Sequence, residues 1–236
     1  VVFVRDFGDW SGELVRNGPD LLAPVDSKLA PIGLDGMYGR IAVPFESYGG
    51  VVLVCGGIGC TPMFAVLMHL AQIEKAHATM RRVTLVWSFR ELELVSAFAQ
   101  ELRAASALGW NLMLHHTTAG TLPRGAEGDS GAMVSHDNVQ SRHGCLQQLP
   151  DGFPRDLAEH VRPGRPQLQP IYAEISDALD TQIRNSKHCS RDSAGNRQTC
   201  AVLACGPSAL VHSAKQACVQ HDATTEFEFH SEEFEW

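Results

Sequence analysis

Residues 50–62 read Gly-Val-Val-Leu-Val-Cys-Gly-Gly-Ile-Gly-Cys-Thr-Pro, and this stretch decides the fold. Residues 50–55 form a continuous apolar run bounded by glycines, which is typical of a central parallel strand buried on both faces. Thr61 and Pro62 then open a helix, because proline is well tolerated in a first helical turn. The stretch therefore predicts a strand, a glycine turn and a helix.

The turn between this strand and this helix has the chemistry of an anion site. Glycines let the backbone approach a ligand closely, and a helix N-terminus offers unpaired N–H groups and a positive dipole end. The turn is not a Walker A loop, because no Gly-Lys-Ser/Thr follows, and it is not a strict G-x-G-x-x-G. Taken alone, it also fits a tight connection that binds nothing.

A transmembrane helix is an alternative for the same region. No Asp, Glu, Lys or Arg occurs between Glu46 and Glu74, which is long enough to cross a bilayer on charge alone. The glycines and the proline in the middle would weaken a lipid-facing helix, so a strand, a turn and a helix explain the stretch better.

Further along the chain, short β-rich runs alternate with amphipathic helical runs. Additional strands are expected over residues 82–88, 111–117, 199–205 and 225–230. Helices are expected from Thr61, over residues 94–105, over 168–183 and over 208–220. Alternation of this kind predicts an α/β fold with a doubly wound, five-stranded parallel sheet.

The remaining segments differ from this pattern. Long polar loops are expected near residues 118–160, extending to about Pro166, and near 185–198. Two short strands are expected before the first glycine turn, over residues 1–4 and 31–35, and no helix follows either of them. We therefore expect two domains: residues 1–46, the end of a β-barrel, and residues 47–236, the α/β domain.

Composition limits the classes of function. The chain has 236 residues, is 44% hydrophobic and has a net charge of −8, so it can bury a core and is a poor non-specific nucleic-acid binder. Seven scattered cysteines without a C-x-x-C motif indicate free thiols in a reducing compartment, with a Cys189–Cys200 disulfide as the alternative. No metal site is expected, since neighbouring His115 and His116 point to opposite faces of a strand. No signal peptide or initial methionine is present, and a fragment is expected.

A second motif, Cys205-Gly206-Pro207, ends the predicted strand over residues 199–205. Ligands of open α/β sheets bind at the carboxyl ends of the strands, beside the point where the strand order reverses. The strands 50–55 and 199–205 flank that point in the usual order, so Cys205 would face the pocket formed by residues 56–61. A buried cysteine can also be a simple packing residue.

Together these motifs resemble the ferredoxin–NADP reductase superfamily, and more narrowly its ferric reductase and NADPH oxidase branch. The resemblance rests on six stretches, namely residues 56–62, 205–207, 35–39 (Asp-Gly-Met-Tyr-Gly), 86–91 (Val-Trp-Ser-Phe-Arg-Glu), 164–166 (Gly-Arg-Pro) and 232–236 (Glu-Glu-Phe-Glu-Trp). Two positions depart from it: Met37 stands where the family usually has proline, and Cys60 where it often has valine. The family's flavin-binding motif and its haem-bearing membrane helices would precede Val1.

The resemblance implies a ferredoxin reductase-like NADP-binding fold and roles for individual residues. Residues 56–62 and 205–207 would bind the pyrophosphate and ribose of NADPH or approach the edge of the flavin. The residues in these two stretches are Gly56, Gly57, Ile58, Gly59, Cys60, Thr61, Pro62, Cys205, Gly206 and Pro207. Arg90 and Arg165 are candidates for the 2′-phosphate, because a guanidinium matches a phosphate bidentately. Cys205, Trp236 and Thr61 would lie at the reacting centre, with Trp236 covering the flavin ring and Glu233 and Glu235 near the nicotinamide carboxamide.

The implied function is hydride transfer from NADPH to FAD, followed by single-electron transfer through haem to ferric iron or to oxygen. The partners would be an FAD-binding lobe and a transmembrane haem domain of the same protein, which would place this segment on the cytosolic face of a membrane. The alternative is a nucleotide-binding or docking module without turnover, which the Met37 and Cys60 departures motivate.

Overall fold

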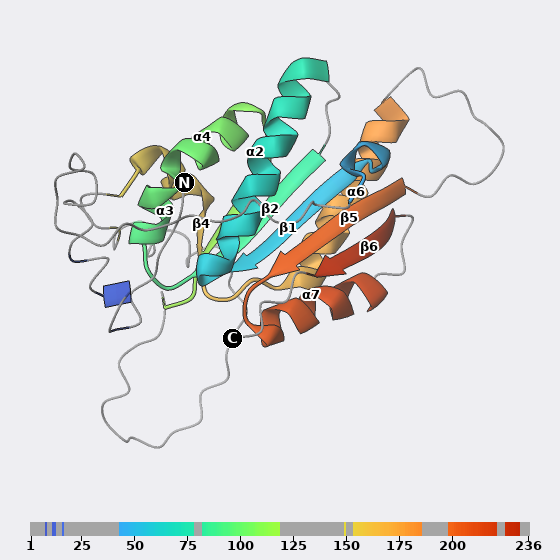
Figure 1. Cartoon of the computed structure of the whole chain (residues 1–236). Coiled ribbons are helices and arrows are strands. Elements are labelled where there is room, and N and C mark those ends of the chain that lie inside the picture. The colour runs from blue at the N-terminus through green and yellow to red at the C-terminus, as the bar shows by residue number, and fades with distance from the viewer. Residues whose placement is uncertain are drawn as a thin grey trace. The chain divides into compact units, whose positions relative to one another are not determined.

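The computed structural model in Figure 1 describes residues 8, 11, 12, 16, 43–77, 82–118, 149, 153–185, 198–220 and 225–231. The chain divides into two compact units, Val1–Ala42 and Val43–Trp236. In the first unit the described residues form a turn, in which the Gly12 amide donates to the Gly8 carbonyl at 2.7 Å. The strands predicted over residues 1–4 and 31–35 lie outside the described residues.

The second unit contains one parallel sheet of six strands, in the order β4-β3-β2-β1-β5-β6 (Figure 1). The strands are β1 (Gly50–Gly56), β2 (Arg82–Phe89), β3 (Asn111–His116), β4 (Val161–Pro163), β5 (Gln198–Cys205) and β6 (Thr225–Ser231). Strand order runs outward from β1 in both directions, which confirms the doubly wound α/β fold. The sheet has six strands and not five.

The additional strand, β4, lies inside a stretch that the sequence predicts as loop. Its three residues pair in parallel with residues 114–116 at the end of β3. Just before it, the short helix η3 (Arg155–His160) is joined to α4 (Ala99–Ala107) by a bidentate ion pair between Arg103 and Asp156, at 2.6 and 2.9 Å. A strand of three residues, one of them a proline, is too short to show a period-2 pattern in the sequence. The loop prediction is wrong for β4 for that reason.

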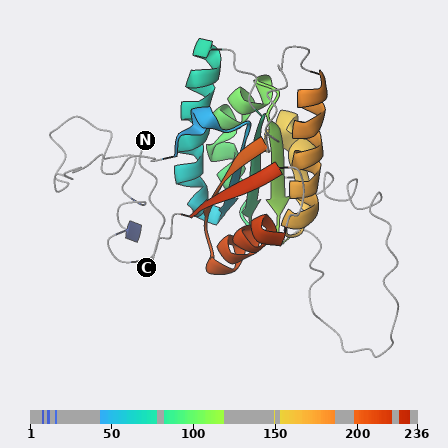
Figure 2. The ribbon, with the colours of Figure 1, turned by 90° about the vertical axis from the view of Figure 1, so that its right-hand side faces the viewer.

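Helices cover both faces of the sheet (Figure 2). One face is covered by α2 (Cys60–His77), α3 (Glu93–Ala97) and α4, and the other by α6 (Leu168–Asn185) and α7 (Ser208–Gln220). The single helix predicted over residues 94–105 is in fact two, interrupted at Phe98. The ring of Phe98 is buried and stacks on the ring of Phe64 at a centroid distance of 4.3 Å. Apolar spacing alone cannot show the interruption, because both helices bury the same side.

The two-sided cover explains the continuous apolar run of β1. Val51, Leu53 and Cys55 belong to the core beneath α2 and α4. Val52 and Val54 belong to the core beneath α6 and α7. Because successive side chains of a strand point to opposite faces, every residue of this strand is buried.

The same stretch excludes the transmembrane alternative for residues 46–74. It folds as η1 (Phe45–Ser47), β1, the single turn η2 (Gly57–Gly59) and α2. Among the described residues, no helix has both the length and the apolar character needed to cross a membrane.

Candidate functional site

The candidate site lies where the strand order reverses, between the carboxyl ends of β1 and β5. The two strands are hydrogen-bonded neighbours, and Cys55 is in register with Cys205. The chain leaves β1 toward α2 on one face and leaves β5 toward α7 on the other (Figure 1). This is the predicted position, because such a divergence opens a crevice beyond the strand ends.

The two turns that meet here, residues 56–61 and 205–207, lie backbone against backbone, and we call them the glycine cradle. A Cβ on Gly59 would lie 2.8 Å from the carbonyl oxygen of Cys205. A Cβ on Gly206, whose φ is +146°, would lie 2.9 Å from the Gly56 nitrogen. Both glycines are therefore required by the contact between the turns, and side chains are excluded from it.

Gly57 has a different reason to be glycine. Its φ is +53°, and nothing lies within 4 Å of the position that a Cβ would take. Its carbonyl accepts a hydrogen bond from the indole Nε1 of Trp87 at 3.1 Å, and the Thr61 hydroxyl donates to the Ile58 carbonyl at 3.2 Å. These two hydrogen bonds hold the backbone of the turn in place. The side of Gly57 on which a Cβ would lie stays open, and we call it the outer side of the turn.

Trp87 contacts the candidate site, and the sequence reasoning gave it no role there. It is fully buried in β2, with its ring against Phe64, Phe89 and Phe98 at centroid distances of 5.4, 5.0 and 5.8 Å. A tryptophan in a buried strand needs a hydrogen-bond acceptor for its indole N–H. This requirement could have predicted from the sequence that Trp87 contacts the neighbouring turn.

Three buried thiols line the base of the cradle: Cys55, Cys60 and Cys205. Burial raises the pKa of Cys55 well above its usual value, and it raises the pKa of Cys60 to about 12, with Cys205 close by. At neutral pH Cys55 and Cys60 are therefore uncharged, and neither is an activated nucleophile. The alternative disulfide partner Cys200 is also a free, buried thiol, while Cys189 lies outside the described residues.

Arg90 and Arg165 are both exposed and both follow strand ends, Arg90 after β2 and Arg165 after β4. The end of β3 lies between them in the sheet. His116 is hydrogen-bonded to the segment after β2 and to the segment after β4. Its Nε2 donates to the Arg90 carbonyl at 3.0 Å, and its own carbonyl accepts from the Gly164 amide at 3.0 Å. The candidate phosphate ligands thus stand on the same edge of the sheet as the cradle.

His115 occupies the opposite face from His116, as the strand pattern predicts. The His116 ring stacks on Phe89, whereas His115 is buried with 6% exposure and is in register with Ser88 of β2 and Arg162 of β4. The pKa of His115 is lowered to about 4, chiefly by burial and then by the charge of Arg162, while a backbone hydrogen bond with Gly164 acts in the opposite direction. The imidazole is therefore neutral at physiological pH.

Lowering the pH from neutrality is expected to destabilise the protein through His115. Its pKa is about 4 in the fold against a usual 6.5, so between these values the unfolded chain binds one more proton than the folded chain. The free energy of unfolding should then fall by up to about 3 kcal/mol as the pH drops through this window. Urea unfolding at a series of pH values measures this slope.

The matched comparison for this prediction is His115→Gln against His212→Gln. His212 is exposed on α7, so its replacement should leave the slope unchanged, whereas His115→Gln should flatten it. Parallel slopes for the wild type and His115→Gln would show that His115 is not buried in its neutral form.

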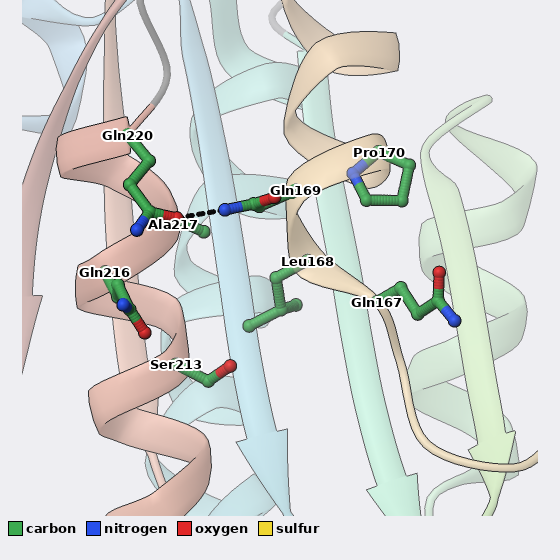
Figure 3. A pocket seen from close by; sticks show the side chains of 8 residues that line it. All are labelled: Gln167, Leu168, Gln169, Pro170, Ser213, Gln216, Ala217 and Gln220. Atoms are coloured by element: carbon green, nitrogen blue, oxygen red, sulfur yellow. Dashed lines mark hydrogen bonds between the residues drawn. The ribbon is translucent and has the colours of Figure 1, made fainter.

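A separate cavity of about 280 Å³ lies between the first turn of α6 and α7 (Figure 3). Its lining is uncharged, four of its eight residues are glutamines, and Gln169 is hydrogen-bonded to Gln220. None of the predicted site residues lines it.

Four residues singled out in the sequence lie outside the described residues: Trp236, Glu233, Glu235 and Met37.

The sequence model of one protein family, described as the ferric reductase NAD binding domain, matches residues 48–219, which include the cradle, Arg90 and Arg165. The chain belongs to this family. The match confirms the resemblance to ferric reductases and assigns the chain to an NAD-binding domain of oxidoreductases.

Individual relatives agree with this assignment. Ferric reductase transmembrane component 1 of Schizosaccharomyces pombe is 24% identical over 210 residues, covering 87% of this chain and 30% of that protein. Ferric reduction oxidase 8, mitochondrial, of Arabidopsis thaliana is 34% identical over 94 residues, covering 39% of this chain and 13% of that protein. The chain thus spans less than a third of the length of either relative.

Among solved structures, a flavohemoglobin from Malassezia yamatoensis with bound FAD and haem matches with a TM-score of 0.42 and 18% identity. The match covers 82% of this chain and 35% of that one.

Proposed function

We propose that the glycine cradle binds the pyrophosphate of NADPH and that this ferric reductase NAD-binding domain delivers the hydride of NADPH to FAD. The observation that supports this most directly is the contact between the two turns at the strand reversal. Gly59 and Gly206 bring two backbones within reach of each other and leave no side chain between them. An extended diphosphate needs such a bare backbone surface beside a helix N-terminus.

The residues of the cradle fit this ligand. The outer side of Gly57 is open, and α2 begins directly after the turn with no acidic residue in its first turn. The N-terminal end of an 18-residue helix carries a partial positive charge and unpaired N–H groups, both of which favour a diphosphate. The hydrogen bond from Trp87 holds the Gly57 carbonyl inward, away from the negative charge.

Arg90 and Arg165 would distinguish NADPH from NADH. Both guanidinium groups are exposed on the carboxyl edge of the sheet, on either side of the end of β3. A guanidinium can donate two parallel hydrogen bonds to a phosphate monoester, which the ribose of NADH lacks.

When bound, the nicotinamide supplies a hydride and the flavin accepts it and releases electrons singly. The residues of this chain bind and orient. Cys205 would lie beside the nicotinamide and act by position and low polarity, because it is buried at the end of β5. Trp236 would cover the flavin ring and yield to the nicotinamide, while Thr61 keeps the entrance of α2 in place through its hydrogen bond to Ile58.

The remaining parts of the electron path would lie outside this chain. We infer an FAD-binding lobe, a transmembrane haem domain and a position of this segment on the cytosolic face of a membrane. The relatives, named ferric reductase transmembrane component and ferric reduction oxidase, favour ferric iron as the acceptor over oxygen.

Titration of the protein with NADPH and NADH tests this proposal. We expect NADPH to bind at least about tenfold more tightly, and Arg90→Ala to weaken NADPH by about 10- to 100-fold, the equivalent of one or two charge-assisted hydrogen bonds. Affinity for NADH should stay unchanged in the variant. Calorimetry measures both constants without needing turnover.

Lys215→Ala is the control, because Lys215 is an exposed cation on α7 and its loss changes the net charge equally. Equal losses in Arg90→Ala and Lys215→Ala would reduce the role of Arg90 to general electrostatic attraction. Absence of binding by both nucleotides would favour an inert docking module. Against that module stands the position of Cys60, whose side chain is buried in the core.

A further inference from the structure

Tyr48, Glu228 and His230 form a polar cluster outside the cradle, and the proposed function does not use it. The phenol oxygen of Tyr48 lies 3.5 Å from Nε2 of His230, and the same Nε2 lies 3.5 Å from Oε1 of Glu228. Burial raises the pKa of Tyr48 to about 12, with a hydrogen bond and the charge of Glu228 as further causes, so this carboxylate also faces the phenol. We call these three residues the β6 cluster.

The sheet explains how residues 182 positions apart come to meet. Phe227 and Phe229 of β6 pack against the core beneath α6 and α7. Glu228 and His230 therefore point to the opposite face, because alternate residues of a strand share a face. Tyr48 belongs to the core on that opposite face. It lies just before β1, and β5 alone separates β1 from β6 in the sheet.

The β6 cluster is open to solvent on one side. The side chains of Glu228 and His230 keep 56% and 30% of their exposure, whereas Tyr48 is buried at 7%. β6 ends the strand order of the sheet, and α2, the helix on this face, packs on β1 and β5. An ion in solution can therefore reach the carboxylate and the imidazole, while the phenol closes the cluster from the inside.

The spacing of the three groups fits a tetrahedral metal ion. Both contacts of His230 Nε2 are longer than an ordinary hydrogen bond, which spans about 2.7–3.2 Å. Zinc binds nitrogen and oxygen at about 2.0–2.2 Å, which places neighbouring ligands of a tetrahedron about 3.4 Å apart. An octahedral Mg²⁺ site would place them about 2.9 Å apart and would favour oxygen over an imidazole. The observed distances therefore favour Zn²⁺.

The chemistry of the donors also fits this ion. In the described parts of the chain, no three residues drawn from His, Cys, Asp and Glu form a metal site. The β6 cluster contains two of these types, and its third donor is a phenol oxygen. A bound cation favours loss of the phenol proton, and the resulting phenolate is an anionic oxygen donor like a carboxylate. Glu228 and Tyr48 would then balance both charges of the ion.

We propose that Tyr48, Glu228 and His230 bind one Zn²⁺ ion, with a water molecule in the fourth position. Three bonds form, to Nε2 of His230, to a carboxylate oxygen of Glu228 and to the phenol oxygen of Tyr48. The phenol proton passes to solvent, and the ion keeps its oxidation state. The ion links the edge strand β6 to the residue that precedes β1, so its binding stabilises this edge of the sheet.

Cobalt substitution in the full chain tests the geometry. Co²⁺ accepts the ligands of Zn²⁺, and its visible absorption is much stronger in a tetrahedral site than in an octahedral one. We expect one equivalent of Co²⁺ to give the strong visible bands, and Zn²⁺ to remove them. A thiolate ligand would add a charge-transfer band in the near ultraviolet. That band would place the ion on cysteines and overturn the proposal.

Variants of the ligands test the assignment. Tyr48→Phe, Glu228→Gln and His230→Gln should each weaken Zn²⁺ binding at least about tenfold, since loss of even an outer partner of a ligand costs about 10- to 100-fold. Competition with a chromophoric chelator measures these constants. Tyr48→Phe is the most informative variant, because it keeps the buried ring and removes the oxygen alone.

Glu226→Gln and His212→Gln are the matched controls. Glu226 is exposed on the same face of β6, two residues before Glu228, and His212 is exposed on α7. Both variants should bind Zn²⁺ as the wild type does, although Glu226→Gln removes the same charge as Glu228→Gln.

Thermal unfolding supplies a second readout. Zn²⁺ should raise the Tm of the wild type and of Glu226→Gln, and it should leave the Tm of Glu228→Gln unchanged. Equal Tm shifts in Glu226→Gln and Glu228→Gln would overturn the proposal. So would wild-type affinity for Zn²⁺ in the three ligand variants, since the β6 cluster would then be held by hydrogen bonds alone.

Discussion

Replacing Gly206 by alanine is expected to lower the free energy of unfolding by about 2–6 kcal/mol and to abolish dinucleotide binding. The new Cβ would lie 2.9 Å from the Gly56 nitrogen and 3.1 Å from the Gly56 Cα, and both atoms are backbone that cannot turn aside. Overpacking of this kind costs about 1–3 kcal/mol. The φ of +146° adds about 1–3 kcal/mol of strain for a residue that has a Cβ.

Gly109→Ala separates the two contributions. Gly109 also has a positive φ, +73°, but nothing lies within 4 Å of its Cβ position, so alanine there should cost only about 1–2 kcal/mol of strain. Gly59→Ala isolates the contact, because its Cβ would meet the Cys205 carbonyl at 2.8 Å. Urea unfolding and NADPH calorimetry measure both effects. If Gly59→Ala kept wild-type stability and affinity, the close contact of the two turns would not be what forms the site.

Replacing Trp87 by alanine is the second change with a large expected effect. Removal of this fully buried indole should cost about 3–5 kcal/mol of stability, because it leaves a cavity among three phenylalanine rings. Trp87→Phe is the more informative variant. It keeps much of the packing but removes the hydrogen bond to the Gly57 carbonyl, so it should cost about 1–3 kcal/mol and weaken nucleotide binding several-fold.

Trp110→Phe is the matched control for this hydrogen bond. Trp110 is also buried, with 7% exposure, but it lies after α4, at the amino end of β3 and away from the glycine turn. Its replacement should lower stability through packing alone and leave the affinity for NADPH unchanged. Equal losses of affinity in Trp87→Phe and Trp110→Phe would mean that the indole supports the core and not the turn.

The sequence was most informative where local patterns and fold rules agree. The continuous apolar run of residues 50–55 predicts a strand covered on both faces, and β1 is covered by α2 on one face and by α6 and α7 on the other. The rule that ligands bind at a strand reversal then placed residues 56–61 beside residues 205–207, and in the structure these turns are in contact although nearly 150 residues separate them.

Other features could not be predicted because they depend on contacts distant in sequence. β4 is three residues long, and it is a strand only because the end of β3 offers it hydrogen bonds. The interruption at Phe98 leaves the apolar spacing of residues 94–105 intact. The reason for glycine at position 206 is the backbone of Gly56, which no local motif contains.

The sequence by itself determined the alternation of strands and helices, the glycines at positions 56, 57 and 59 and the cations that follow the strands, since propensity and hydrophobic periodicity are local properties. Only the tertiary structure decided that the indole of Trp87 supports the turn and that His115 is buried in register with Arg162. The physical reason is that burial and hydrogen-bond partners depend on which strands become neighbours. That pairing is determined by the packing of the whole sheet against its two helical layers.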